Sequence, residues 1–456
     1  MQMRSINESG QVVRVLLMKH ARWFSLGSLW LVGAVFGVGC RSGLEGGEGG
    51  DASGGHMNGS GGQAGGSAGT GPGGEGGDAS GGPGKSIYYL TSTVFGADGD
   101  RQVYVGLDDS LDDFKFSTGS AREFAGVASL EAIDRTLYVA SGEEPTITRY
   151  QITDEFEWIE ESSVSFSNYP LSDNANFFYQ YRADDHTWYL PFDGNRRILW
   201  DPLELKLLGT RDDSSVPLEQ EGLMLEAGGN RTGVRYEGSV LQPYFYHDDD
   251  WLNFAPASPI AVYDPNTHAE TAVLEAPCPG LAVPSVDEEG NVYFSSWDHT
   301  PYFALFDAGP PPCVVKVSRE REIDVDFTTD LTELTGGRYA MNFRYVRDGW
   351  GFADVLHHEE LEGDFTGEPD IDVLDQIFEF THFHLWRIDL KNGRAERYED
   401  AETGSFGWST ARIDGRSLLF VPQDGGAKTK IYELDVDGGA KQLFEVEGDA
   451  SLGKVR

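Results

Sequence analysis

One short pattern in this sequence combines residue types and a spacing that suit metal chemistry. His382 and His384 lie two residues apart in an apolar stretch, and alternate residues of a β-strand point to the same side. Both imidazoles are therefore predicted to reach one ion, and imidazole with carboxylate suits zinc, copper or iron. The further ligands that the sequence offers are Glu379, His357 and His358.

The alternative interpretation of the same stretch is purely structural. Strand alternation also places Phe380 and Trp386 on the side of the two histidines, which would give a packed aromatic row with two hydrogen-bonded imidazoles. Elsewhere the chain has no G-x-S-x-G elbow, phosphate-binding glycine loop, H-E-x-x-H or C-x-x-C-H motif. We therefore assign no catalytic residue and expect no cofactor, and a binding protein is favoured over an enzyme.

Charge restricts the ligands that such a protein can bind. The formal net charge is −40, which makes nucleic acid and anionic lipid poor partners. An anionic ligand would need a local group of arginines, together with aromatic and polar side chains in neighbouring loops. The candidate ligand-binding residues in predicted loops are Arg122, Asn176, Arg231, Arg235, Trp297, His299 and Trp408.

The beginning of the chain has the features of an export signal followed by a tether. Residues 1–39 form a predicted signal peptide, in which Met18 is a candidate start before a cationic segment and an apolar run. Cys40 follows Gly39 as in a bacterial lipobox and is the predicted lipidation site; ordinary cleavage nearby is the alternative. Residues 40–84 are almost entirely small or acidic, so they are predicted to be a disordered linker. The remaining chain is expected at the cell envelope, with the outer membrane favoured.

The two cysteines beyond Cys40 are predicted to form a disulfide. Cys278 and Cys313 each lie in a proline-containing loop, on either side of an expected strand pair around Tyr293 and Leu305. Export favours a disulfide between two cysteines, and a metal site would need more soft ligands than this region offers.

An alternating apolar pattern recurs along residues 85–456 about every 50 residues. A four-stranded blade needs roughly 40–50 residues, so the period predicts a seven-bladed β-propeller; another all-β fold with unrelated turns is the alternative. The seven patches are Ile87–Leu90, Thr136–Val139, Thr187–Leu190, Ser239–Leu241, Asn291–Phe294, Arg338–Met341 and Ser417–Val421.

Turn residues extend this prediction to the edges of the blades. An aspartate followed by a turn ends a strand at Asp201, Asp264, Asp389 and Asp435, as expected between the third and outer strands of a blade. The first strands are expected to close the ring by pairing with strands near Ile431 and Leu443. The last gap between patches is longer, which predicts an insertion near residues 351–380.

From about Ser86 to Arg456 the chain resembles the MxcI-type proteins encoded with myxochelin siderophore genes. The stretches that carry the resemblance are Tyr88–Gly96, Ala121–Ser129 and Leu137–Tyr150. The resemblance implies a tethered propeller connected with ferric siderophore uptake, distantly similar to propeller lipoproteins that capture ferric catecholates beside an outer-membrane receptor. Catalytic residues are not implied.

Three functions follow as hypotheses. The first is a membrane-tethered binding protein for a ferric catecholate siderophore, with an outer-membrane receptor as a candidate partner. The second is a protein-interaction platform at the cell envelope. The third is a propeller enzyme of the quinoprotein or hydrolase kind, because fold alone does not decide function.

Overall fold

The computed structural model of the chain describes residues 5–6, 12–13 and most of 85–455. The gaps in the last range are 96–100, 127, 142–144, 170, 172–179, 193–194, 213–214, 228–232, 237, 249–252, 298–299, 307–308, 325–326, 328, 362–364, 366–381, 402–408, 424–425, 436 and 438. Predictions for Cys40, for the linker 40–84, and for most of the signal segment lie outside the described residues. No helix within the described ranges is long and apolar enough to cross a membrane.

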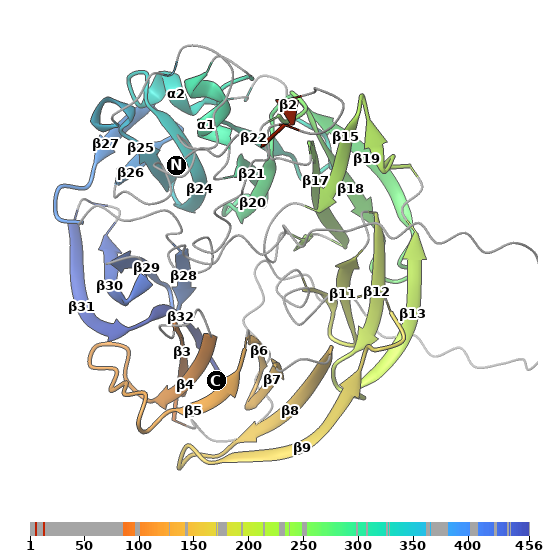
Figure 1. The fold of residues 1–456 in the computed structure, drawn as a ribbon, viewed down its shortest axis with the longest axis vertical. Helices are drawn as coiled ribbons and strands as arrows, with labels where there is room; N and C mark the ends of the chain where they lie inside the picture. Colours follow the sequence, from red (N-terminus) through yellow and green to blue (C-terminus); the bar gives the residue numbers. More distant parts are fainter. Residues whose placement is uncertain are drawn as a thin grey trace, which may run out of the picture.

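The domain is a seven-bladed β-propeller, as the repeat predicted, with its blades arranged in a ring (Figure 1). From the centre outward, blade 1 contains β32 (Asp449–Lys454), β3 (Tyr88–Phe95), β4 (Arg101–Asp108) and β5 (Arg122–Ala125). Blade 2 contains β6 (Ser129–Ile133), β7 (Thr136–Ala140), β8 (Thr146–Ile152) and β9 (Trp158–Ser165). Blade 3 contains β10 (Tyr181–Asp184), β11 (Thr187–Phe192), β12 (Arg196–Asp201) and β13 (Lys206–Asp212).

Blade 4 departs from four simple strands. Its second, third and outer strands are β17 (Ser239–His247), β18 (Ser258–Tyr263) and β19 (Glu270–Ala276). Two separate segments pair with the inner side of β17, namely β15 (Leu223–Ala227) and β16 (Val234–Tyr236). A short strand, β14 (Glu219–Gln220), pairs with β15. The innermost position of this blade is therefore shared by two strand segments.

The last three blades follow the four-strand plan. Blade 5 contains β20 (Leu281–Val286), β21 (Val292–Ser296), β22 (Cys313–Val317) and β23 (Thr329–Asp330), with helices α1 (Thr300–Leu305) and α2 (Leu331–Leu334) in its connections. Blade 6 contains β24 (Tyr339–Arg347), β25 (Trp350–Leu356), β26 (Phe383–Asp389) and β27 (Arg394–Arg397), with the 3₁₀ helix η2 (His358–Glu360) between β25 and β26. Blade 7 contains β28 (Ser409–Ile413), β29 (Arg416–Gln423), β30 (Lys428–Asp435) and β31 (Gly439–Glu447). A separate pair joins β1 (Ser5–Ile6) to β2 (Val12–Val13).

The apolar patches lie on second strands in every blade except blade 6. The patch at Arg338–Met341 begins the first strand, β24, and the second strand is β25. A two-residue hairpin at Asp348 and Gly349, both with positive φ, joins these strands, as the twist of an antiparallel pair favours. Because both strands are largely buried, the sequence pattern could not tell one from the other.

The predicted aspartate turns are confirmed as hairpins between third and outer strands. Asp201 Oδ1 accepts the amide of Leu203 at 2.9 Å between β12 and β13, and Asp264 Oδ1 accepts that of Asn266 at 2.8 Å between β18 and β19. Asp389 fixes the turn from β26 to β27 by accepting the amide of Asn392 at 2.9 Å. In each case the short aspartate side chain accepts a hydrogen bond from a backbone amide of the turn.

Three details of the prediction were wrong. The ring is closed by β32, which pairs with β3, whereas Ile431 and Leu443 lie on β30 and β31 inside blade 7. Leu305 lies in helix α1 and not in a strand. The insertion in blade 6 begins after Leu356 and not at residue 351, because residues 350–356 form β25.

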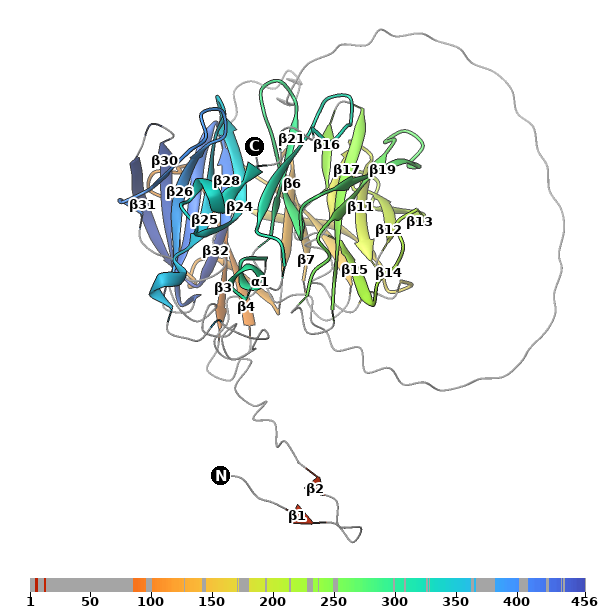
Figure 2. The same cartoon turned by 90° about the horizontal axis from the view of Figure 1, so that it is seen from above.

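The strand order gives the ring two unlike faces. One face carries the connections from second to third strands and from each blade to the next; we call it the α1 face, because it includes α1 (Figure 2). The other, the hairpin face, carries the tight turns between first and second strands and between third and outer strands. Long connections, which can carry binding residues, are therefore gathered at the α1 face.

Candidate functional site

A cluster of histidines and one glutamate lies at the α1 face of blade 6. Its formation follows from the pairing of β25 with β26, in which Leu356 is opposite Phe383 and Val355 is opposite His384. The amide of His357 donates to the carbonyl of His382 at 3.0 Å, which extends this pairing by one residue. Side chains that are opposite or diagonal in an antiparallel pair share one face, so His357 comes to lie beside His384.

Glu360 of η2 lies among the imidazoles. Its Oε1 is 3.2 Å from His384 Nε2 and 3.6 Å from His357 Nδ1, and its Oε2 is 3.7 Å from His382 Nδ1. The rings of His357 and His384 have their centroids 3.9 Å apart, and these residues are only 5% and 4% exposed. Both imidazoles are thus withdrawn from water and share the same carboxylate.

The electrostatics of the cluster favour neutral imidazoles beside an ionised carboxylate. Burial lowers the pKa of His357 to about 4, and the neighbouring His384 imidazole acts in the same direction. Burial also lowers the pKa of His384, against the effect of its hydrogen bond to Glu360. For Glu360, burial acts to raise the pKa, but hydrogen bonding and charge from the imidazoles outweigh it and hold the pKa below its ordinary value.

Two neighbours orient this cluster from the side. Trp386, on β26, donates its indole N–H to His357 Nε2 at 3.1 Å, so the proton of neutral His357 is assigned to Nδ1, which faces Glu360. Arg338 binds Glu359 with 2.6 Å between Nη2 and Oε1, and its guanidinium lies 5.8 Å from the Trp386 ring centre. The arrangement can hold either a shared proton or a cation.

The sequence predicted part of this cluster. His382 and His384 do approach one carboxylate, at 3.7 and 3.2 Å from the oxygens of Glu360, and Trp386 does share their side. Glu379 lies outside the described residues. Glu360 was missed, because only the turn of η2 brings it back over β26. His358 lies apart from the cluster, with its ring 5.4 Å from that of Tyr339.

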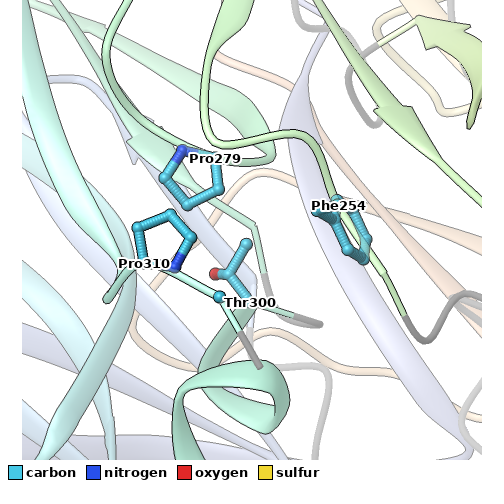
Figure 3. Close-up of a pocket in the computed structure, with 5 residues that line it drawn as sticks. Phe254, Pro279, Thr300 and Pro310 are labelled. Carbon is cyan, nitrogen blue, oxygen red and sulfur yellow. The ribbon is translucent and has the colours of Figure 1, made fainter. Parts of the chain in front are cut away.

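A small, mostly apolar pocket lies on the same face beside the cysteines (Figure 3). It is lined by Phe254, Pro279, Thr300, Gly309 and Pro310. The structure joins Cys278 and Cys313 in a disulfide with their Cα atoms 5.9 Å apart.

Gly280 makes this close packing feasible. Its φ is +56°, and a Cβ there would lie 2.6 Å from Thr300 Cγ2, so a larger residue would force the α1 connection outward.

The three predicted ligand-binding residues that the structure describes do not form one site. Trp297 lies at the α1 face, where its amide donates to the carbonyl of Gly280 at 2.8 Å. Arg122 lies on β5, the outer strand of blade 1, with its guanidinium 4.6 Å from the ring centre of Tyr150. Arg235 lies on β16 with Nη1 3.8 Å from Asp185, at the hairpin face. The predicted residues outside the described ranges are Asn176, Arg231, His299 and Trp408.

Arg122 and Arg235 were misplaced for a topological reason. The prediction put every candidate in a loop at one face of the ring. Successive connections of a blade, however, lie alternately at the α1 face and the hairpin face, and its successive strands lie progressively farther from the centre. Arg122 lies on β5, which pairs with β4 and is the last strand of its sheet, and this pairing places it at the rim.

No pattern in the sequence indicated the two carboxyl groups that lie on innermost strands. Glu226 lies on β15 and Asp449 on β32. Burial raises the pKa of Glu226 to about 7 and that of Asp449 to about 6. Both residues are half-buried, and strand alternation alone does not show which polar residue comes to lie at the centre of a ring.

Glu226 leads to a pH-dependent prediction. A carboxyl group whose pKa is higher in the folded than in the unfolded protein stabilises the fold at low pH, and this contribution is lost as the pH rises through the folded value. The free energy of unfolding of the wild type should therefore fall relative to that of Glu226→Gln as the pH rises. We expect this difference to change by roughly 1–2 kcal/mol, in favour of the variant, from about pH 5.5 to about pH 8.5. Urea denaturation at both pH values measures this difference. Glu219→Gln, on exposed β14, serves as the control, and an equal gain in both variants would contradict the prediction.

Comparison with known proteins identifies no family for this chain. No family model matches the chain, and no curated protein matches it. A candidate 6-phosphogluconolactonase from Bacteroides fragilis is 11% identical with a TM-score of 0.48, covering 81% of this chain and 98% of its own. The β-propeller domain of the Trilobed protease from Pyrococcus furiosus is 9% identical with a TM-score of 0.42. The match covers 78% of this chain and 92% of that domain. Such low similarity carries no inference about activity, and the propeller is established by the strand pairing described above.

Proposed function

We propose that this protein is a cell-envelope binding module whose ligand docks on the α1 face of blades 5 and 6, and that a ferric catecholate siderophore is its ligand. The identity of the ligand comes from the resemblance to the MxcI-type proteins. The location comes from the way in which two long connections, β21–β22 and β25–β26, meet on one face.

The contact between these connections is the observation that carries the proposal. Tyr339 donates its hydroxyl to the carbonyl of Ala304, at the end of α1, at 2.9 Å. Phe306, beyond α1, has its ring 5.8 Å from that of Phe365 in the blade 6 insertion. Neighbouring blades thus build one continuous platform, with the small pocket and Trp297 on one side and the histidine cluster on the other.

This platform offers the kinds of groups that an aromatic, anionic complex requires. Trp297 is partly exposed and can stack on a catechol ring. Arg338 lies at the blade 6 side, where it is paired with Glu359, so an anionic ligand would have to compete with this carboxylate. Since the whole chain carries a charge of −40, binding should depend strongly on these local groups.

Titration with ferric and iron-free catecholate siderophores tests the proposal. The protein from Lys85 onward, which contains every strand of the closed ring, should show saturable quenching of tryptophan fluorescence only with the ferric form. Trp297→Ala should weaken binding about tenfold or more, because stacking on an aromatic side chain is lost.

Trp350→Ala is the matched control. Trp350 is also partly buried, but it begins β25 at the hairpin face and lies under Arg387, 4.1 Å from the guanidinium carbon. Equal loss in both variants, or no iron-dependent response from a folded protein, would remove the siderophore proposal.

A protein partner is the second candidate, and a different part of the ring favours it. The outer region of blades 2 and 3 exposes Ile159 on β9, Leu208 on β13 and Leu203 in the turn before β13, which are 50%, 45% and 40% exposed. Ile159→Ser and Leu208→Ser would weaken capture of such a partner, and they should leave siderophore binding unchanged.

A further inference from the structure

The donor atoms of the histidine cluster have a spacing that matches a metal centre. One ligand atom from each of His357, Glu360 and His384 can be chosen so that all lie within 4.8 Å of one another. Two donors that are each 2.0–2.1 Å from a tetrahedral ion lie about 3.3 Å apart. The distances from Glu360 Oε1 to His384 Nε2 and His357 Nδ1 are 3.2 and 3.6 Å, so small side-chain shifts would complete this geometry.

We propose that His357, Glu360 and His384 bind one divalent transition-metal ion of the zinc class, and that His382 is a fourth ligand. The ligand atoms are His357 Nδ1, His384 Nε2, His382 Nδ1 and a carboxylate oxygen of Glu360. Imidazole nitrogens select such ions over magnesium and calcium, which prefer oxygen ligands. This site is independent of the siderophore proposal and requires no siderophore.

The cluster is open to solvent at Glu360 and closed at the two histidines. Glu360 is 41% exposed, whereas the side chains of His357 and His384 are 7% and 4% exposed. The ion would therefore reach the cluster along the glutamate and be held from below by two imidazoles that the β25–β26 pairing has already positioned. Ligands that are placed by strand pairing lose little further entropy on binding.

Hydrogen bonds of both buried imidazoles must change when the ion binds. His384 Nε2 lies 3.2 Å from Glu360 Oε1 and must give up the proton that it donates to this carboxylate. Trp386 donates to His357 Nε2, which leaves the proton on Nδ1, the atom that faces the other ligands. Metal binding at Nδ1 needs the proton on Nε2, because a ligating histidine donates its other ring N–H. The indole and Nε2–H would then be two donors facing each other, so the indole must rotate away. Trp386 thus competes with the metal and also reports on it.

The experiment uses the full-length protein after removal of metal with a chelator. Titration with Zn²⁺ and Co²⁺ is followed by calorimetry, by the visible absorption of Co²⁺ and by tryptophan fluorescence. We expect one ion per chain and a change in fluorescence at the same equivalence point. His384→Gln and Glu360→Gln should weaken binding about 100-fold or more, since each removes a ligand.

His358→Gln is the matched control, because His358 is in the same 3₁₀ helix but lies against Tyr339. It should bind Zn²⁺ like the wild type. Trp386→Phe should bind at least as tightly, because the competing hydrogen bond is gone, and its metal-dependent fluorescence change should be lost. This pair of results would not arise if the cluster were merely structural.

Several outcomes would overturn the proposal. They are the absence of saturable Zn²⁺ or Co²⁺ binding at micromolar concentration, equal weakening by His358→Gln and His384→Gln, and unchanged affinity in Glu360→Gln. Because Glu360 is largely at the surface, Glu360→Gln should fold even if a histidine variant does not. Circular dichroism on each variant verifies the fold.

Discussion

Ending the chain at Gly448 should abolish cooperative folding of the whole propeller. The truncation removes β32, which pairs with β3 from Thr93↔Asp449 to Tyr88↔Lys454. It also removes Ala450, Leu452 and Val455, which are buried between blades. Loss of these backbone hydrogen bonds at about 1 kcal/mol each, and of buried apolar side chains at about 1.5–3 kcal/mol each, would exceed about 5 kcal/mol. The total free energy of unfolding of a protein domain is typically about 5–15 kcal/mol.

Thermal unfolding followed by circular dichroism measures the effect. A protein that begins at Lys85 is the control, because it retains β3 and β32 and should unfold like the full chain. A peptide of residues 449–455 added to the truncated protein should restore the transition in part, whereas a scrambled peptide should not. A truncated protein with the melting temperature of the control would contradict the role of β32.

Loss of the disulfide should have the next largest effect. Cys278 and Cys313 are 35 residues apart in sequence, and a link across a loop of this length restricts the unfolded chain by about 3–4 kcal/mol. The double variant Cys278→Ala, Cys313→Ala should lower the free energy of unfolding by this amount. Both cysteines are buried in the core between blades 4 and 5, so the cavity adds to the loss.

Urea denaturation with and without reductant provides an internal control for this prediction. Reductant should lower the midpoint of the wild type towards that of the double variant and should leave the variant unchanged. If the wild type and the variant unfold at the same urea concentration without reductant, the disulfide does not stabilise the domain.

The fold was predictable because two local signals agree with the global arrangement. Each blade needs a buried second strand and a tight turn before its outer strand, and both leave a pattern within a few residues, as around Thr187–Leu190 and Asp201. The signal failed in blade 6 because β24 and β25 are both apolar and only two residues separate them. It also failed at β32, whose partner β3 lies at the other end of the chain.

The candidate site was predictable only where its residues are close in sequence. The spacing of His382 and His384 indicated a shared side because strand alternation is a local property. The positions of His357 and Glu360 depend on how β25 pairs with β26 and on how η2 turns, and these contacts cross the insertion in blade 6. Arg122 lies at the rim and Arg235 at the hairpin face. Neither position was predicted, because no pattern close to these residues in the sequence specifies their place in the ring.

The residue pattern alone predicted seven repeated β units, the residues that begin their outer hairpins, and the two histidines that share a side. These features depend on hydrophobic alternation and turn chemistry, which act over a few residues. Packing of the blades sets which strand closes the ring, which carboxyl groups lie half-buried on innermost strands, and which residues meet Glu360. Those features arise when blades far apart in the chain pack together, and the energies that place them belong to contacts that do not exist until the ring has formed.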